Sequence, residues 1–123
     1  MSKLFRYMDD FNEDISRWDV SSVTYMYNMF EEATSFNQPI GNWDVSNVTD
    51  MEGVFYYSVF NQPIIEWNTS NVEVMKNMFY QNSSFNHNLS NWNVSNVTDC
   101  SSFSGGATSW YLPKPNFTNC DPD

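Results

Sequence analysis

Apolar residues follow two spacings within each stretch of about 25 residues. In the segment Ile40-Gly-Asn-Trp43-Asp-Val45, the apolar residues Trp43 and Val45 lie two apart and Asp44 separates them. In an extended chain, residues two apart point to the same side. The pattern therefore predicts a short strand whose apolar side faces inward.

The second spacing follows directly and has the period of a helix. Apolar residues stand at positions i, i+3, i+6 and i+7, namely Val48, Met51, Val54 and Phe55. Such residues form one stripe along about two helical turns. Ser46 stands before them at a helix N-cap position. The pattern predicts a short helix, which would need neighbouring units because an isolated helix of this length does not persist in water.

Both patterns recur with one shared period of 24 or 25 residues. The recurring columns are Phe11, Phe36, Phe60, Phe85; Trp18, Trp43, Trp67, Trp92; Val23, Val48, Val72, Val97; and Met26, Met51, Met75, Cys100. They predict four units, which are residues 11–35, 36–59, 60–84 and 85–109. Residues 1–10 match the tail of a unit and are interpreted as a partial N-terminal repeat. Residues 110–123 leave the pattern and are interpreted as a C-terminal cap.

A unit of this length is too short to form a core alone, so it must bury its apolar side against copies of itself. The expected fold is a right-handed α/β repeat solenoid of leucine-rich-repeat type. Short parallel strands would lie on one face and short helices on the other. The four Trp residues of the second column would then stack in one buried row inside it.

The repeated residues also carry a family resemblance. The pattern FNxxIxxWxVSNVTDMxxMF, covering residues 4 to about 110, resembles the BspA-like bacterial surface-protein repeat. That family is a divergent leucine-rich repeat that includes mycoplasma lipoproteins. The resemblance implies a surface or interaction module without catalysis, at the cell surface or secreted. The sequence itself shows neither a signal peptide nor an anchor.

The charge balance narrows the classes of partner. Lys and Arg number 5 against 15 Asp and Glu, which gives a formal net charge of -10. This charge argues against nucleic acid, whose backbone needs a basic face, and against adsorption to anionic membranes. The sequence contains no run of about 18 apolar residues, so it does not predict a segment inserted into a membrane. Cationic partners and neutral sugars stay open, and acidity that only serves solubility is the alternative interpretation.

No set of nucleophile, base and hydrogen-bond donor is recognisable, so the chain is expected not to be an enzyme and to use no cofactor and no metal. The single histidine, His87, stands where other units have Gln38 and Gln62. The two cysteines, Cys100 and Cys120, have no metal-binding spacing. They allow either one disulfide over the last segment or two free thiols.

The outward positions of the predicted strands form one candidate binding stripe. Its residues are Arg17, Asp19, Asn42, Asp44, Glu66, Asn68, Asn91 and Asn93. Neighbouring strands would stack about 4.8 Å apart. The side chains could therefore bond one another as a ladder, contact a protein or glycan, or hold a cation, although two acids in one row fall short of a closed oxygen cage.

The predicted function is a non-enzymatic recognition or adhesion module that presents a repeat face to protein or glycan partners. The alternative is a structural component of a larger assembly, such as a virion or fibre, that associates through the solenoid ends. Residues 1–10 resemble half a unit, which places Phe5, Tyr7 and Met8 near an incompletely covered edge. This edge is expected to contact another chain, either an identical copy or upstream repeats if the sequence is a fragment, unless residues 1–10 cover it by themselves.

Overall fold

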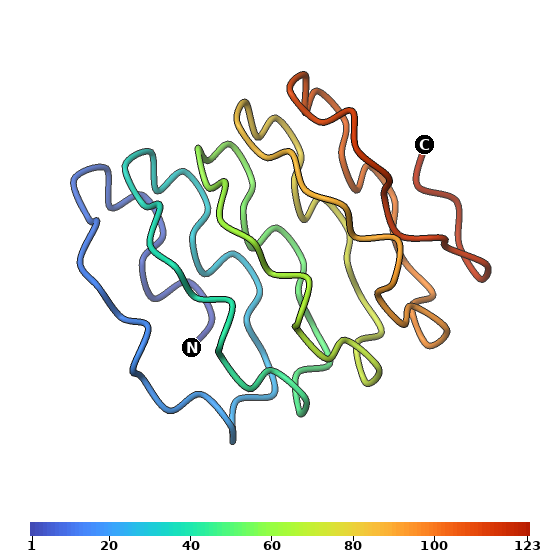
Figure 1. Cartoon of the computed structure of the whole chain (residues 1–123), viewed down its shortest axis with the longest axis horizontal. Coiled ribbons are helices and arrows are strands. Elements are labelled where there is room, and N and C mark those ends of the chain that lie inside the picture. The colour runs from blue at the N-terminus through green and yellow to red at the C-terminus, as the bar shows by residue number, and fades with distance from the viewer.

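The polypeptide winds through successive turns that lie side by side, from the N-terminal end (blue) to the C-terminal end (red) in Figure 1. The computed structural model describes all residues, 1–123. It contains no helix and no extended strand. Its regular pairing consists of isolated parallel bridges, Tyr25 with Asp50, Asp50 with Val74, and Val74 with Asp99. The predicted α/β solenoid of leucine-rich-repeat type, with strands and helices on opposite faces, is therefore wrong.

The segment predicted to be helical folds as consecutive tight turns. The Val54 N–H donates to the Met51 carbonyl at 3.4 Å, and the Tyr56 N–H donates to the Gly53 carbonyl at 3.2 Å. Gly53 and Tyr57 have φ angles of 60° and 51°, in the left-handed region that an α-helix of L-residues excludes. Turns of type II require such a φ at their third residue. A four-residue turn also points its first and last side chains the same way, so its i, i+3 spacing imitates a helical stripe.

The same pair of left-handed residues, four apart, recurs along the whole stack. The other pairs are Lys3 and Tyr7, Asn28 and Glu32, Asn77 and Gln81, and Ser102 and Gly106. These turns leave alternate N–H groups free to bind the next unit. In a helix the same N–H groups would bond within the unit. Because every buried backbone group needs a partner, the free N–H groups of these turns must bond to a neighbouring unit. The turn conformation therefore satisfies the backbone by joining units together.

This joining forms what we call the inter-unit ladder, built from residues 2–7, 26–32, 50–57, 74–81 and 99–106. Between the second and third of these segments, Met26, Asn28 and Phe30 donate their N–H groups to carbonyls of the next unit at 2.9, 2.7 and 3.0 Å. The pattern repeats in each later pair of segments. Backbone bonds along one side of the molecule thus hold the units in register.

In the segment predicted to be a strand, buried and exposed residues alternate as expected, but the backbone does not form an extended strand. Trp43 and Val45 are buried and Asp44 is exposed. The segment lies between two tight turns, closed by the Trp43 N–H on the Ile40 carbonyl at 3.1 Å and by a second turn from Val45. Neighbouring units meet here through side chains, since the Trp43 indole N–H donates to the Ile15 carbonyl at 3.0 Å.

The interior is one cluster of 30 buried hydrophobic residues. Phe30 stacks on Phe36 at 4.1 Å and on Phe55 at 5.8 Å between ring centroids. The Trp column is buried in its last three members, Trp43, Trp67 and Trp92. The expectation of a fully buried row is wrong for Trp18, which is 44% exposed because no full unit covers it.

The two ends of the stack are covered differently. Residues 1–10 supply only a ladder segment, in which Phe5 donates its N–H to the Met29 carbonyl at 3.0 Å and is buried. Residues 110–123 cover the other half of the last unit, where the Leu89 N–H donates to the Pro113 carbonyl at 2.9 Å. The side-chain amide of Asn119 also donates to the Ser95 carbonyl at 2.7 Å. The structure also lacks any apolar helix of membrane-spanning length.

Candidate functional site

The candidate binding stripe lies on the outer surface. All eight predicted residues are exposed, in pairs that flank each Trp of the column: Arg17, Asp19, Asn42, Asp44, Glu66, Asn68, Asn91 and Asn93. The sequence alternation explains their exposure, since the residues between them point into the core. The structure therefore arranges them as two parallel columns across four units.

One of these columns, which we call the Asx column, consists of Asp19, Asp44, Asn68 and Asn93. Each side chain accepts a hydrogen bond from the backbone two residues onward. In the first unit the Asp19 Oδ1 accepts from the Ser21 N–H at 3.0 Å and from the Ser21 hydroxyl at 2.6 Å. Short polar side chains form such Asx turns readily. The column members thus bond within their own units and do not form a ladder with one another.

The Asx turns leave one terminal atom of each side chain without a partner in the chain. That atom is a carboxylate oxygen in Asp19 and Asp44, and an amide nitrogen in Asn68 and Asn93, because Oδ1 accepts from the turn in each case. The column therefore presents two hydrogen-bond acceptors followed by two donors. Its orientation is fixed by the turns and does not depend on a ligand.

The two carboxylates are held in their charged form. The Ser21 hydroxyl, followed by the Ser21 N–H, lowers the pKa of Asp19 below its usual value. Ser46 lowers the pKa of Asp44 in the same order, although the neighbouring charge of Asp19 opposes it. Negative charge is consequently concentrated at the N-terminal half of the column.

The second column, Arg17, Asn42, Glu66 and Asn91, differs in character. Its side chains change in charge from unit to unit. None of them makes a side-chain hydrogen bond within the chain, so nothing fixes their orientation. They border the Asx column and could adjust to whatever occupies it.

The structure contains no group of three or more His, Cys, Asp or Glu side chains placed to hold a metal ion. Cys100 and Cys120 are joined in a disulfide, with their Cα atoms 5.8 Å apart. The bond ties the cap to the last unit, and the chain has no free cysteine.

Two further polar columns were not singled out from the sequence, although both recur with the same period. In one, the Asn37 N–H donates to the Asn12 Oδ1 at 2.9 Å, and later units repeat the contact. In the other, amides such as Asn47 donate to a Ser carbonyl of the preceding unit. His87 belongs to this kind of joint, because its Nε2 lies 3.1 Å from the Asn61 carbonyl. These columns join units and leave the Asx column free.

Comparison with known proteins identifies the repeat. The family model described as "Mycoplasma protein of unknown function, DUF285" matches residues 1–59 and 57–118. The chain belongs to the DUF285 family. The match confirms a mycoplasma-type repeat but does not extend to the BspA-like or leucine-rich-repeat assignment. No curated protein and no solved structure matches the chain.

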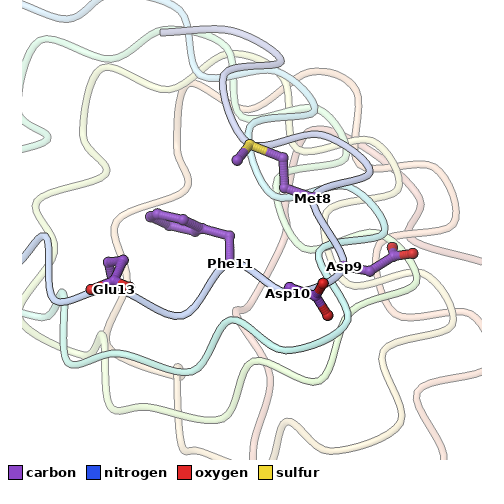
Figure 2. Close-up of a pocket in the computed structure, with 5 residues that line it drawn as sticks. All are labelled: Met8, Asp9, Asp10, Phe11 and Glu13. Atoms are coloured by element: carbon purple, nitrogen blue, oxygen red, sulfur yellow. The ribbon is translucent and has the colours of Figure 1, made fainter.

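The DUF285 chain has a second surface feature, at its N-terminal end. A hollow of 390 Å³ is lined by Met8, Asp9, Asp10, Phe11 and Glu13 (Figure 2). It combines two apolar side chains with three acids beside the first full unit. The half-unit thus leaves part of this end uncovered, with Leu4 and Met8 47% and 44% exposed.

Proposed function

We propose that this DUF285 chain is a non-enzymatic recognition module that presents its Asx column to a protein or glycan partner. The observation that carries the proposal is that four polar side chains, each fixed by its own turn, expose one free atom per unit. Groups that are already oriented lose less conformational entropy when they bind. A regular row of this kind suits an extended partner with its own regular hydrogen-bonding groups.

The proposal includes presentation outside the cell, at the surface or after secretion. The resemblance to BspA-like surface repeats favours this location, and the mycoplasma-type repeat is compatible with it. The net charge of -10 disfavours nucleic acid and anionic lipid as partners. Neutral oligosaccharides and basic protein surfaces match the carboxylate and amide groups better.

An experiment on the outward atoms tests the proposal. The wild-type protein would be screened on an array of neutral and anionic oligosaccharides and on a panel of immobilised extracellular proteins. The double variant Asp19→Asn, Asp44→Asn keeps an oxygen for each Asx turn but replaces the outward carboxylate oxygen with an amide. We expect it to bind the best ligand about tenfold or more weakly, a loss of about 1.4 kcal/mol.

The matched control is the double variant Glu32→Gln, Glu73→Gln. It removes the same two negative charges at exposed positions outside the Asx column. It should bind within about twofold of the wild type. Equal weakening by both double variants would mean that net charge alone attracts the ligand, and no loss in either would contradict the assignment of the face.

A second candidate function is a structural part of a larger assembly, such as a virion or fibre, that associates through the ends of the stack. The observation that favours it is the unequal coverage of the two ends, where ladder groups have no partner within the chain. This candidate does not involve the Asx column. The two proposals can therefore be tested separately.

A further inference from the structure

The two ends of the stack leave opposite backbone groups without a partner. Within the stack, the N–H groups of one ladder segment donate to carbonyls of the next, as Phe79 does to Phe103 at 2.8 Å. In the last segment the corresponding N–H groups have no acceptor in the chain: Ser102, Ser104 and Gly106. In the first segment the corresponding carbonyls accept nothing: Ser2, Leu4 and Arg6. One end thus offers donors and the other offers acceptors.

These free groups share one register. The donors Asn77, Phe79 and Gln81 are matched in the last unit by Ser102, Ser104 and Gly106. The acceptors that they use are Ser101, Phe103 and Gly105, which are matched in the first segment by Ser2, Leu4 and Arg6. A second copy that continues the stack beyond the last unit would therefore place its three free carbonyls opposite the three free N–H groups of the first copy, at the same spacing.

The coverage of the two ends is complementary as well. The cap, residues 110–123, lies along residues 86–100 of the last unit through bonds to Leu89 and Ser95 and through the disulfide. Its one backbone bond to residues 101–107 is a local turn, in which the Trp110 N–H donates to the Ala107 carbonyl at 3.2 Å, and it leaves the N–H groups of Ser102, Ser104 and Gly106 without a partner. The half-unit, residues 1–10, consists of a ladder segment, and this is the part of a unit that the cap lacks. Figure 1 shows these two partial units at opposite ends of the stack.

Apolar side chains lie at both of the ends that would meet. The Phe column, which contains Phe30, Phe55 and Phe79, ends at Ser104 in the last unit. A hollow of 270 Å³ opens beside Ser104, and Phe103 and Phe117 also line it. At the opposite end, Leu4 stands in the column of Phe103 and is 47% exposed. Exposed apolar surface of this kind favours contact with another chain.

Charge contributes little to this contact. The first ladder segment carries Lys3 and Arg6, but Arg6 pairs with Glu31 of its own chain at 2.7 Å between Nε and Oε2. At the opposite end, Asp123 lines the hollow beside Ser104 together with Lys114. The direction of the contact therefore depends on the backbone groups. A contact between two N-terminal ends would instead bring acceptors against acceptors.

We infer that the N-terminal ladder segment of one chain docks on the C-terminal ladder segment of a second copy. The inference deepens the assembly candidate described above and is independent of recognition by the Asx column. Because the two surfaces differ, each bound copy offers a free end to the next copy. Such head-to-tail contacts extend into an open chain of copies unless rotation closes them into a ring.

Site-specific cross-linking tests the register. Lys3 and Ser102 occupy the same ladder column, both with left-handed φ angles, 60° and 54°. Neighbouring ladder positions lie about 5 Å apart, within the Cα separation of a disulfide. The single variants Lys3→Cys and Ser102→Cys, mixed and oxidised, should give a mixed dimer on a non-reducing gel. Peptide mapping would verify that Cys100 and Cys120 remain paired.

The control mixture pairs Lys3→Cys with Ser90→Cys, an exposed position in the last unit outside the ladder. It should give at least fivefold less mixed dimer, about 1 kcal/mol of preference. No excess of the Lys3–Ser102 product over this control would overturn the inference. So would a main product formed by the Lys3→Cys variant with itself, which would indicate a symmetric contact.

Light scattering after gel filtration measures association without added cysteines. The wild type should shift from monomer to a broad series of larger species as its concentration rises to about 1 mM. At this concentration a contact with a Kd of about 1 mM is about half occupied. Leu4→Glu should stay monomeric, while Ile65→Glu, also partly exposed but in the third unit, should associate like the wild type. A wild type that stays monomeric at this concentration would overturn the inference and leave recognition by the Asx column unaffected.

Discussion

Single side chains fix the candidate face through their own turns. The oxygen that Asp44 uses for the Asx turn is also the atom that Ser46 stabilises, so local structure and charge state are coupled in one group. A carboxylate that accepts hydrogen bonds has a lowered pKa because its charged form is favoured. The Asx column thus keeps its charge at a pH where ordinary carboxylates begin to take up protons.

The variant Ser46→Ala tests this coupling. It removes the first cause of the lowered pKa of Asp44 and keeps the backbone N–H, so the pKa should rise toward the usual value of about 3.9 and stay below it. The folded state of the wild type gains stability from Asp44 above this usual value and loses it as pH falls through the lowered pKa. The variant should show a smaller acid-dependent loss, measured by NMR titration of the carboxyl group and by unfolding at pH 2–7. Ser35→Ala, at an exposed position without a side-chain hydrogen bond, should change neither.

At the scale of the element, the sequence predicted the period and the inward residues but not the backbone conformation. The i, i+3 spacing of Val48 and Met51 fits both a helical stripe and a series of four-residue turns. Left-handed φ angles distinguish the turns from a helix. Most of these angles occur at residues whose type does not favour a positive φ, such as Glu32 and Tyr57. Gly53 and Gly106, and also Asn28 and Asn77, mark these positions by residue type. The exposed stripe was predictable from the alternation alone, whereas its Asx turns depend on conformations that the alternation does not specify.

The joints between units can be tested through the Trp column. The Trp67 indole N–H donates to the Ile40 carbonyl at 3.0 Å in the buried interior. Trp67→Phe removes this bond and some packing volume, and we expect it to lower the free energy of unfolding by roughly 1–3 kcal/mol. Trp18→Phe is the matched control, because Trp18 is exposed and makes no such bond; it should cost less than about 0.5 kcal/mol. Equal losses, measured by urea denaturation, would contradict a structural role for the joint.

At the scale of the whole molecule, stability depends on neighbouring units and on how the last of them is closed. Each unit contacts mainly the units before and after it, as expected for repeat proteins. The terminal units therefore have one neighbour fewer. The disulfide between Cys100 and Cys120 compensates for this at the C-terminal end by fastening the cap.

Loss of that disulfide should loosen the C-terminal end first. A cross-link with a sequence separation of 20 stabilises a folded protein by about 3 kcal/mol in the chain-entropy estimate. The double variant Cys100→Ala, Cys120→Ala should unfold at lower urea concentration by about this amount. Amide hydrogen exchange should rise most in residues 85–123. Uniform exchange along the chain would contradict an end-specific effect.

The prevailing direction of the inter-unit ladder has an electrostatic consequence for the whole stack. Alternate N–H groups along each ladder segment point toward the next unit and the matching carbonyls toward the previous one, while a few bonds at the start of a segment run the other way, as from the Val74 N–H to the Thr49 carbonyl at 3.3 Å. Peptide dipoles aligned in this way add along an axis, as they do in a helix. The ladder therefore has a partly negative pole at Ser2, Leu4 and Arg6 and a partly positive pole at Ser102, Ser104 and Gly106. The stack is a polar rod, and such rods attract one another in line and in the same direction.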